Sequence, residues 1–172
     1  MLFRSQYSGD LYTKYIYGSA EVVGLMCLRI FYRNDDESYE NLKPYARKLG
    51  EAFQKVNFLR DIREDFEDKG RVYFPGVDFH SFSEADKKKI EKEIESDFAI
   101  ALQGIQKLKE EVRFGVLLAY LYYKRLFEKI KASPAHLVAT KRFRLSNFRK
   151  ILILIVARFC FVFSKMKGNK LV

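Results

Sequence analysis

Apolar residues recur every three or four positions through most of this chain, and no stretch alternates strictly between apolar and polar residues. The first pattern is that of amphipathic helices, whereas strict alternation would indicate strands. The chain is therefore predicted to be all-α, with polar loops over residues 33–38 and 70–82. The expected helices cover residues 8–32, 44–69, 83–112, 113–131 and 146–166.

Side chains that cap or break helices set these limits. Ser8 is expected to cap the first helix, and Ser83 followed by Asp86 resembles a capping box. Pro44 fits the first turn of the second helix, and Gly70 fits the position just past its end.

The second half of the first helix is apolar almost all round, which predicts a helix buried on every side. Cys27 lies in that half and Cys160 in the last helix, and neither belongs to a spacing that binds metal. Both are interpreted as reduced thiols in the core of a cytoplasmic protein. The first ten residues contain no apolar run of the kind found in signal peptides.

Five carboxylates fall within the eight positions from 61 to 68. At about 100° per residue, the apolar residues of this helix form one arc. Asn57, Asp61 and Asp65 recur every four residues beside that arc, and Gln54 falls on the same stripe. We therefore expect both aspartates to face the interior of the bundle. The arc consists of Phe58, Leu59, Ile62 and Phe66.

Two carboxylates four residues apart repel each other, and near an apolar interior they also lose hydration. A divalent cation relieves both effects, and magnesium prefers carboxylate oxygens together with phosphate oxygens. The stripe is therefore interpreted as a platform for magnesium and diphosphate. The alternative is a solvated acidic helix end. We interpret three residues as solvent-exposed surface groups of this kind: Arg63, Glu67 and Asp68. The role of Glu64 stays open.

Residues 54–75, QKVNFLRDIREDFEDKGRVYFP, resemble the second aspartate-rich motif of the phytoene/squalene synthases. That motif has the form Q-x-x-N-x-L-R-D-x-x-E-D followed by R-x-Y-x-P. Residues 15–26, YIYGSAEVVGLM, are similar to the family's other signature, a tyrosine followed by a small-residue kink in a helix. The resemblance extends over about residues 10–160, and the form SAEVVG is most like bacterial phytoene synthases.

The resemblance implies an all-α isoprenoid synthase fold and the head-to-head condensation of two prenyl diphosphates. In phytoene-type members, geranylgeranyl diphosphate gives phytoene through a cyclopropyl diphosphate intermediate. This is a step of carotenoid biosynthesis that needs magnesium, with manganese as the alternative metal, and no NADPH. One alternative is a squalene- or dehydrosqualene-type synthase that uses farnesyl diphosphate. Another is a non-catalytic subunit that binds prenyl diphosphates.

The resemblance also implies roles for single residues. Asp61 and Asp65 would bind the metal ion with help from Asn57, and both would be catalytic together with Tyr15. Glu21 replaces a small residue of the family pattern, and its role stays open. The residues expected to contact the diphosphate or line the prenyl channel are Gln54, Arg60, Ala20, Val23, Gly24, Tyr123 and Arg142.

The family pairs this motif with a first aspartate-rich motif on a facing helix, upstream of the tyrosine. Only nine residues precede Asp10, and the acids at positions 35–37 lie in a predicted loop that does not fit the pattern. Residues 1–172 are therefore expected to be a single partial domain, the C-terminal part of the fold, with little or no activity alone. A partner chain that carries the remaining helices is one expected interaction.

The formal net charge of +10 is concentrated at one end of the sequence. No acidic residue follows Glu128, whereas eleven Lys or Arg residues do, and residues 1–128 are close to neutral. Within the basic terminal helix and tail, residues 146–172, the 13-residue run 151–163 is broken only by Arg158. That run is too short to span a bilayer comfortably.

This segment is either a core helix that closes the bundle or a helix that makes peripheral contact with a membrane surface. A cytoplasmic location, with or without membrane association, is expected. Nucleic acid is not an expected partner, because the basic segment lacks the polar base-reading residues of known motifs.

Overall fold

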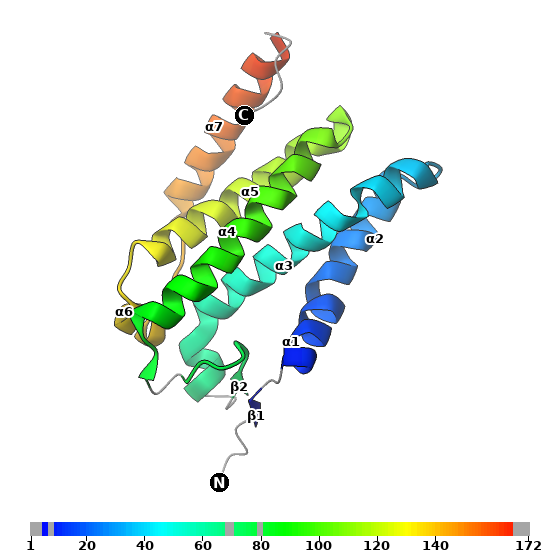
Figure 1. Cartoon of the computed structure of the whole chain (residues 1–172). Helices are drawn as coiled ribbons and strands as arrows, with labels where there is room; N and C mark the ends of the chain where they lie inside the picture. Colours follow the sequence, from blue (N-terminus) through cyan, green and yellow to red (C-terminus); the bar gives the residue numbers. More distant parts are fainter. Residues whose placement is uncertain (1–4, 7–8, 68–70, 79–80, 167–172) are drawn as a thin grey trace.

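The computed structural model describes residues 5–6, 9–67, 71–78 and 81–166 of the chain (Figure 1). Helices account for most of the described residues, and their only sheet is a parallel pair of two-residue strands, so the predicted all-α class is confirmed. The elements are β1 (Ser5–Gln6), α1 (Gly9–Ile16), the π-helical turn η1 (Tyr17–Glu21), α2 (Val22–Phe31), α3 (Asp36–Glu67), β2 (Arg71–Val72), α4 (Glu84–Lys107), α5 (Glu110–Lys131), α6 (Ala135–Thr140) and α7 (Asn147–Met166).

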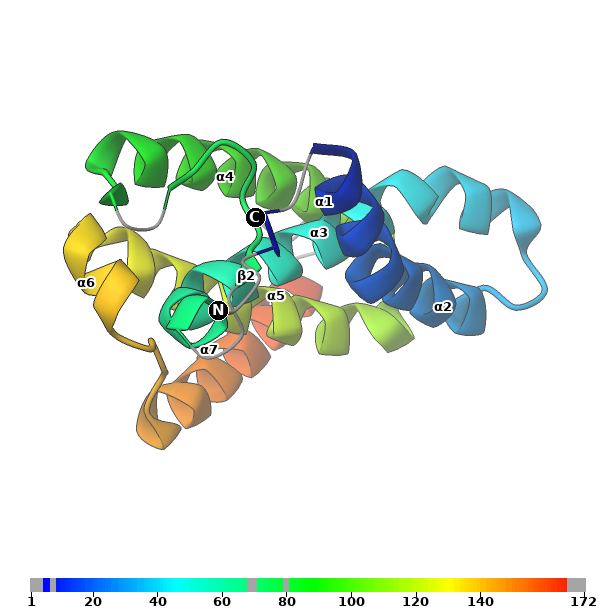
Figure 2. The same ribbon diagram turned by 90° about the horizontal axis from the view of Figure 1, so that it is seen from below.

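The 32-residue helix α3 is the centre of the bundle. It contacts α2 and η1 on one side and α4, α5 and α6 on others, while α7 lies along α5 (Figures 1 and 2). Ala52, Val56 and Leu59 of α3 are fully buried, as is Phe127 of α5. The acidic stripe therefore lies on the central helix of the described bundle, which packs against most of the other helices.

The predicted first helix contains a π-helical turn at its small residues. The backbone N–H of Val22 donates to the carbonyl of Tyr17, five residues earlier, which is the spacing of a π-helix. Here the chain approaches α3 so closely that a Cβ on Gly50 would lie 2.5 Å from the carbonyl oxygen of Ala20. The π-helical turn falls on the small residues at which a kink was expected. The predicted cap, Ser8, lies outside the described residues.

The prediction that the second half of this helix is buried on every side is wrong. Leu28 is buried, but Met26 is 61% exposed and Ile30 is 74% exposed. Helix α2 packs on α3 with one face, and among the described elements none covers the opposite face. Cys27 is consequently a free and exposed thiol rather than a core residue. The side chain of Cys160 lies outside the part that the structure describes.

Two predicted helix boundaries are also wrong: the start of the second predicted helix and the break between the third and the fourth. Helix α3 begins at Asp36 and includes Pro44, because the Asp35 carboxylate accepts the N–H of Ser38 at 3.0 Å and caps the helix earlier. The charges of this segment had suggested a loop. The Ser83–Asp86 capping box of α4 is confirmed.

The break between α4 and α5 falls at residues 108–109 rather than at 112–113. Leu108 and Lys109 are extended, and the N–H of Lys109 donates to the hydroxyl of Tyr32 at 2.9 Å. The short helix α6 was not predicted, whereas α7 matches the predicted helix over 146–166. Among the described residues, no helix has the length and apolar character needed to cross a membrane.

A cluster of charges lies where α3 meets α4, and its members Lys55 and Asp97 are buried. The ammonium group of Lys55 lies 2.7 Å from both Asp97 and Glu51, and Lys48 lies 2.9 Å and 2.6 Å from the same two carboxylates. Burial alone would lower the pKa of Lys55, but its hydrogen bonds to Asp97 and Glu51 raise the pKa above its ordinary value. This network fixes the register of α4 against α3.

Candidate functional site

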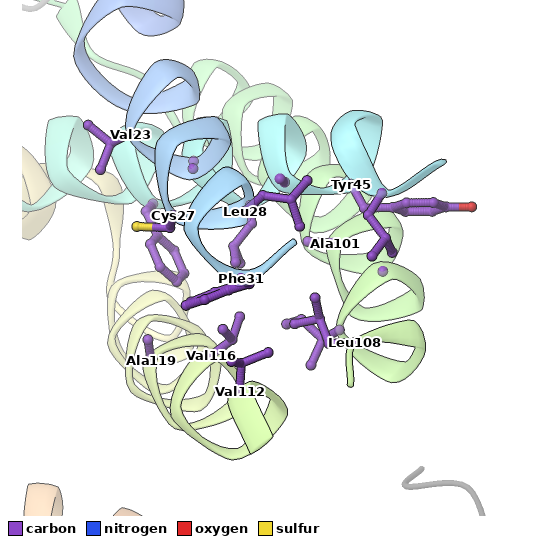
Figure 3. A pocket seen from close by; sticks show the side chains of 18 of the residues that line it. Val23, Cys27, Leu28, Phe31, Tyr45, Ala101, Leu108, Val112, Val116 and Ala119 are labelled. Carbon is purple, nitrogen blue, oxygen red and sulfur yellow. The ribbon is translucent and has the colours of Figure 1, made fainter. Parts of the chain in front are cut away.

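An apolar pocket of about 710 Å³ opens between α2, α3, α4 and α5 (Figure 3). Ser19, Gln54 and Tyr123 give one end of the pocket its polar side chains, and Glu111, three residues after Leu108, also lines the pocket. At the other end, Leu42 and Leu108 belong to one apolar cluster. On α3 the lining runs from residue 42 to residue 54, which corresponds to about 18 Å of helix. The pocket is therefore elongated and amphipathic.

Small residues make room for this pocket. Ala20, Val23 and Gly24, which the sequence predicted to line a channel, all line it, and so do Gln54 and Tyr123. The Tyr123 ring stacks on Phe53 with the ring centroids 4.0 Å apart. Lining residues that the sequence analysis did not single out include Ala101, Gly104, Gly115 and Ala119.

Tyr15 is not among the residues that line the pocket. Its half-buried ring packs 5.5 Å from the ring of Tyr73 and 5.9 Å from that of Phe58. Its carbonyl accepts a hydrogen bond from Ser19, which does line the pocket one turn later. The predicted catalytic tyrosine thus lies beside the polar end of the pocket rather than inside it.

The acidic stripe faces inward as predicted. Asp65 is buried, and the side chain of Asp61 is 17% exposed, whereas the side chain of Glu67 is 56% exposed and paired with Arg63. The amide of Asn57 donates weakly to Gln54 at 3.5 Å, and this contact joins the stripe to the pocket. The predicted arc residues Phe58, Leu59 and Ile62 are buried. Phe66 and Asp68 were also predicted, but the Phe66 side chain and all of Asp68 lie outside the described part.

Two arginines neutralise Asp61. Arg60 contacts the carboxylate at 2.5 Å, and Arg142, from the segment between α6 and α7, contacts it at 3.0 Å. The hydrogen bond to Asp61 raises the pKa of Arg60 above its ordinary value. Arg142 also binds Glu64 at 2.8 Å, so Glu64 holds an arginine at the stripe. Buried Glu21 pairs with Arg47 at 2.5 Å and lies outside the pocket lining.

A second, polar pocket of about 340 Å³ adjoins these arginines. Arg144 and Lys150 line it together with Arg60 and Arg142, so four cations face one cavity. Tyr122 lines this pocket, and its ring contacts that of Tyr123 in the apolar pocket. The sequence analysis missed Arg144, although the excess of basic residues after Glu128 was a signal for it.

The side chains of the stripe fit a hard divalent cation by their chemistry. Asn57 Oδ1 is buried and has no hydrogen-bond partner in the described part of the chain, which leaves one neutral oxygen available beside two carboxylates. Within the same residues, no group of three His, Cys, Asp or Glu side chains is arranged to hold a metal ion. Asp61, Asp65 and Asn57 would be the ligands of any cation bound here. The cation would compete with Arg60 and Arg142 for the Asp61 carboxylate.

These features define an all-α protein with an elongated apolar pocket whose polar end adjoins buried acids and a cationic cavity. The family model for squalene/phytoene synthase matches residues 3–149, and the chain therefore belongs to this family.

Curated relatives include both bacterial and plant proteins. The 4,4'-diapophytoene synthase of Staphylococcus haemolyticus (strain JCSC1435) is 29% identical over 134 residues, which cover 68% of this chain and 45% of that protein. The chloroplastic phytoene synthase 2 of Solanum lycopersicum is 31% identical, covering 91% and 56%. The phytoene synthase of Arthrospira platensis is 26% identical, covering 91% and 58%. The chain spans about half the length of the curated relatives it matches.

Proposed function

We propose that this chain forms the acid-bearing part of a synthase that condenses two molecules of geranylgeranyl diphosphate head to head, giving phytoene for carotenoid biosynthesis. The observation that carries the proposal is the contact between Gln54, which lines the apolar pocket, and Asn57, which begins the acidic stripe. A prenyl tail in the pocket would bring its diphosphate to that stripe. The 4,4'-diapophytoene synthase among the relatives supports a farnesyl-using enzyme as the alternative.

In this proposal Asp61, Asp65 and Asn57 hold magnesium, or manganese in its place. The bound cation would supply positive charge to the departing diphosphate. The partner-free oxygen of Asn57 supports its role, because a buried acceptor without a donor gains most from a cation. No NADPH is expected for a phytoene-type reaction.

The substrate contacts follow from the two pockets. Arg60, Arg142 and Gln54 would bind diphosphate oxygens, because guanidinium groups suit paired phosphate oxygens. Tyr123 stands between the two pockets and would meet the head of the substrate. The tail would lie against Ala20, Val23 and Gly24. Tyr15, one turn from Ser19, keeps its predicted role at the reacting end.

The 172 residues alone are proposed to have little or no synthase activity. Two carboxylates and one amide provide one side of a metal site, and exposed apolar residues of α2 border the open pocket. A partner chain with further acids and helices would complete both. If no such partner exists, the remaining candidate is a subunit that binds prenyl diphosphates without turnover.

Binding tests the site independently of turnover. Isothermal titration of the chain with geranylgeranyl thiolodiphosphate, a non-reactive analogue, is expected to give magnesium-dependent binding. Asp61→Asn and Asp65→Asn should weaken it by at least about tenfold, because each removes one charge that faces the cation. Glu67→Gln, an exposed carboxylate of the same helix, is the matched control and should bind as the wild type does. Binding without magnesium, or equal losses in all three variants, contradicts the site.

Product analysis distinguishes the geranylgeranyl-using reaction from the farnesyl-using alternative. Radiolabelled geranylgeranyl and farnesyl diphosphates are supplied to the chain alone and to the chain co-expressed with the preceding segment of the Arthrospira platensis relative. We expect phytoene from the pair and little product from the chain alone. Clear phytoene formation by the chain alone contradicts the proposed inactivity, and product from farnesyl diphosphate only would favour the alternative. The cytoplasmic location and the lack of nucleic-acid binding stay predictions.

A further inference from the structure

The π-helical turn η1 is held at both of its ends by one side chain of α3. Arg47 donates to the carboxylate of Glu21, the last residue of the turn, at 2.5 Å. The same guanidinium group lies 5.5 Å from the ring centroid of Tyr17, the first residue of the turn. We call Tyr17, Glu21 and Arg47 the η1 clamp.

The clamp contains a buried charge. The side chain of Glu21 is 6% exposed, whereas that of Arg47 is 48% exposed. A carboxylate that loses its hydration is destabilising unless a cation compensates it. Glu21 is not among the residues that line the apolar pocket, so contact with a ligand there does not account for its burial. The carboxylate instead serves to hold Arg47 across the turn.

The turn decides which side chains of α1 and α2 face the site. The N–H of Val22 donates to the carbonyl of Tyr17, so the turn contains one residue more than an α-helical turn. Because an α-helix turns by about 100° per residue, the extra residue rotates α1 against α2 by a similar angle. This rotation lets the Tyr15 ring pack 5.5 Å from that of Tyr73 while Val23 lines the pocket. A continuous α-helix would lose one of these two placements.

Close backbone contacts hold this segment against α3. A Cβ on Gly50 would lie 2.5 Å from the oxygen of Ala20, and one on Gly24 would lie 2.6 Å from the oxygen of Ala46. Contacts between small residues have no preferred direction, whereas a guanidinium group is planar and donates in fixed directions. Arg47 therefore adds what the glycines lack, a directional contact that identifies one residue as the end of the turn.

We propose that Glu21 and Arg47 are positioning residues that keep the extra residue of the helix within positions 17–21 and thereby hold Tyr15 beside the polar end of the pocket. Without the clamp the turn relaxes or moves along the helix, and Tyr15 rotates away from Tyr73. The effect on the reaction rests on the proposed function, in which Tyr15 acts at the reacting end. The placement of the turn does not depend on it.

Fluorescence reports where residue 15 lies, because the chain contains no tryptophan. Tyr15 is half-buried, so the full chain carrying Tyr15→Trp should emit at a shorter wavelength than an exposed indole does. Adding Arg47→Gln should shift this emission to the red. Adding Arg47→Lys should shift it less, because an ammonium group still compensates Glu21.

Arg29 provides a matched control on α2. Its guanidinium group lies 2.5 Å from the carboxylate of Asp36 and 3.5 Å from the ring centroid of Tyr39, so it repeats the chemistry of the clamp outside the π-helical turn. Arg29→Gln should leave the emission of the Tyr15→Trp reporter unchanged.

A second variant separates the clamp from general stability. Glu21→Ala/Arg47→Gln removes both charges, so no lone carboxylate is left buried, and circular dichroism should show a folded chain. Hydrogen exchange followed by mass spectrometry should show the amide of Val22 exchanging about tenfold faster or more, with peptides from α5 unchanged. The reporter should shift to the red as in Arg47→Gln. Faster exchange in all peptides alike would overturn the positioning role.

Turnover tests the link to the reaction. In the chain co-expressed with the preceding segment of the Arthrospira platensis relative, Glu21→Ala/Arg47→Gln should lower kcat by about tenfold or more, because a misplaced reacting group is costly. KM should change little, since Tyr15 is not among the residues that line the pocket. If the wild-type pair forms no product, the proposed function fails, and emission and exchange still decide the clamp. The clamp is overturned if both are as in the wild type, or if Arg29→Gln alters them equally. An unchanged kcat with a shifted reporter would overturn its link to the reaction.

Discussion

The Oδ1 atom of Asn57 is buried without a hydrogen-bond partner among the described residues, and such an atom costs about 1–3 kcal/mol. Asn57→Leu keeps a similar volume and removes that cost. We expect the free energy of unfolding, measured with urea, to rise by about 1 kcal/mol. Manganese binding, measured by electron paramagnetic resonance, should weaken several-fold. Asn41→Leu, at an exposed position of the same helix, should leave manganese binding unchanged. A less stable Asn57→Leu variant with unaltered metal binding would contradict the proposed role.

Arg142 bridges Asp61 at 3.0 Å and Glu64 at 2.8 Å, and it also lines the cationic pocket. It therefore competes with a cation at Asp61 while it favours an anion beside it. Arg142→Gln should bind manganese alone more tightly but manganese with pyrophosphate more weakly, each by several-fold. Arg144→Gln, in the same pocket, should show only the second effect, because its guanidinium is not among the cations paired with Asp61. Two changes of the same sign in Arg142→Gln would exclude the competition.

At the scale of elements, α3 approaches the backbone of the π-helical turn closely at Gly50. A Cβ on Gly50 would lie 2.5 Å from the oxygen and 2.8 Å from the carbon of the Ala20 carbonyl, and backbone atoms cannot rotate away. Gly50→Ala should therefore lower the free energy of unfolding by about 1–3 kcal/mol despite the better helix propensity of alanine. Gly115→Ala on α5 is the control, since a Cβ there meets nothing within 4 Å. It should raise stability by up to about 1 kcal/mol.

The charge cluster between α3 and α4 gives stability a dependence on pH. Burial raises the pKa of Glu51, but hydrogen bonds from Lys48 and Lys55 outweigh it, so the pKa lies below the ordinary value of 4.5. A depressed pKa contributes stability above the unfolded value, and that stability is lost as the pH falls through the folded value. The Glu51→Gln variant should thus have a lower free energy of unfolding than the wild type near neutral pH. This difference in stability should shrink below about pH 4.5. Thermal unfolding across that range measures it, and a constant difference would contradict this assignment.

Periodicity predicted most of the helices and the burial of the stripe, because both depend on which side of one helix is apolar. Asp61 and Asp65 were placed correctly for this reason. Boundaries set by distant contacts were missed: α5 begins after residues 108–109 because Lys109 donates to Tyr32, far away in the sequence. The exposed state of Cys27 could not be predicted either, since an apolar helix does not reveal which of its faces find a partner. Lys150 and Arg60 line the same pocket only because the tertiary fold brings α7 near α3.

At the scale of the whole molecule, an elongated pocket, a stripe of acids and a cationic cavity meet at one end of α3. The apolar end of the pocket lies where α2 approaches the junction of α4 and α5. The distance from the polar end to this point limits the length of the prenyl tail that fits. Gly115 lines the pocket on α5, eight residues before Tyr123, or about 12 Å along the helix. This is the position at which a larger side chain would divide the pocket.

Gly115→Phe places a ring in space where a Cβ meets nothing within 4 Å. If a prenyl tail extends from Tyr123 towards Leu108, the ring should exclude the far end of a geranylgeranyl chain and spare most of a farnesyl chain. We expect affinity for geranylgeranyl thiolodiphosphate to fall by at least about tenfold, the equivalent of roughly two lost methylene burials, and affinity for the farnesyl analogue to fall much less. Titration calorimetry with magnesium measures both, with Gly115→Ala as the control. Equal losses for the two analogues would mean that the tail does not run along this axis.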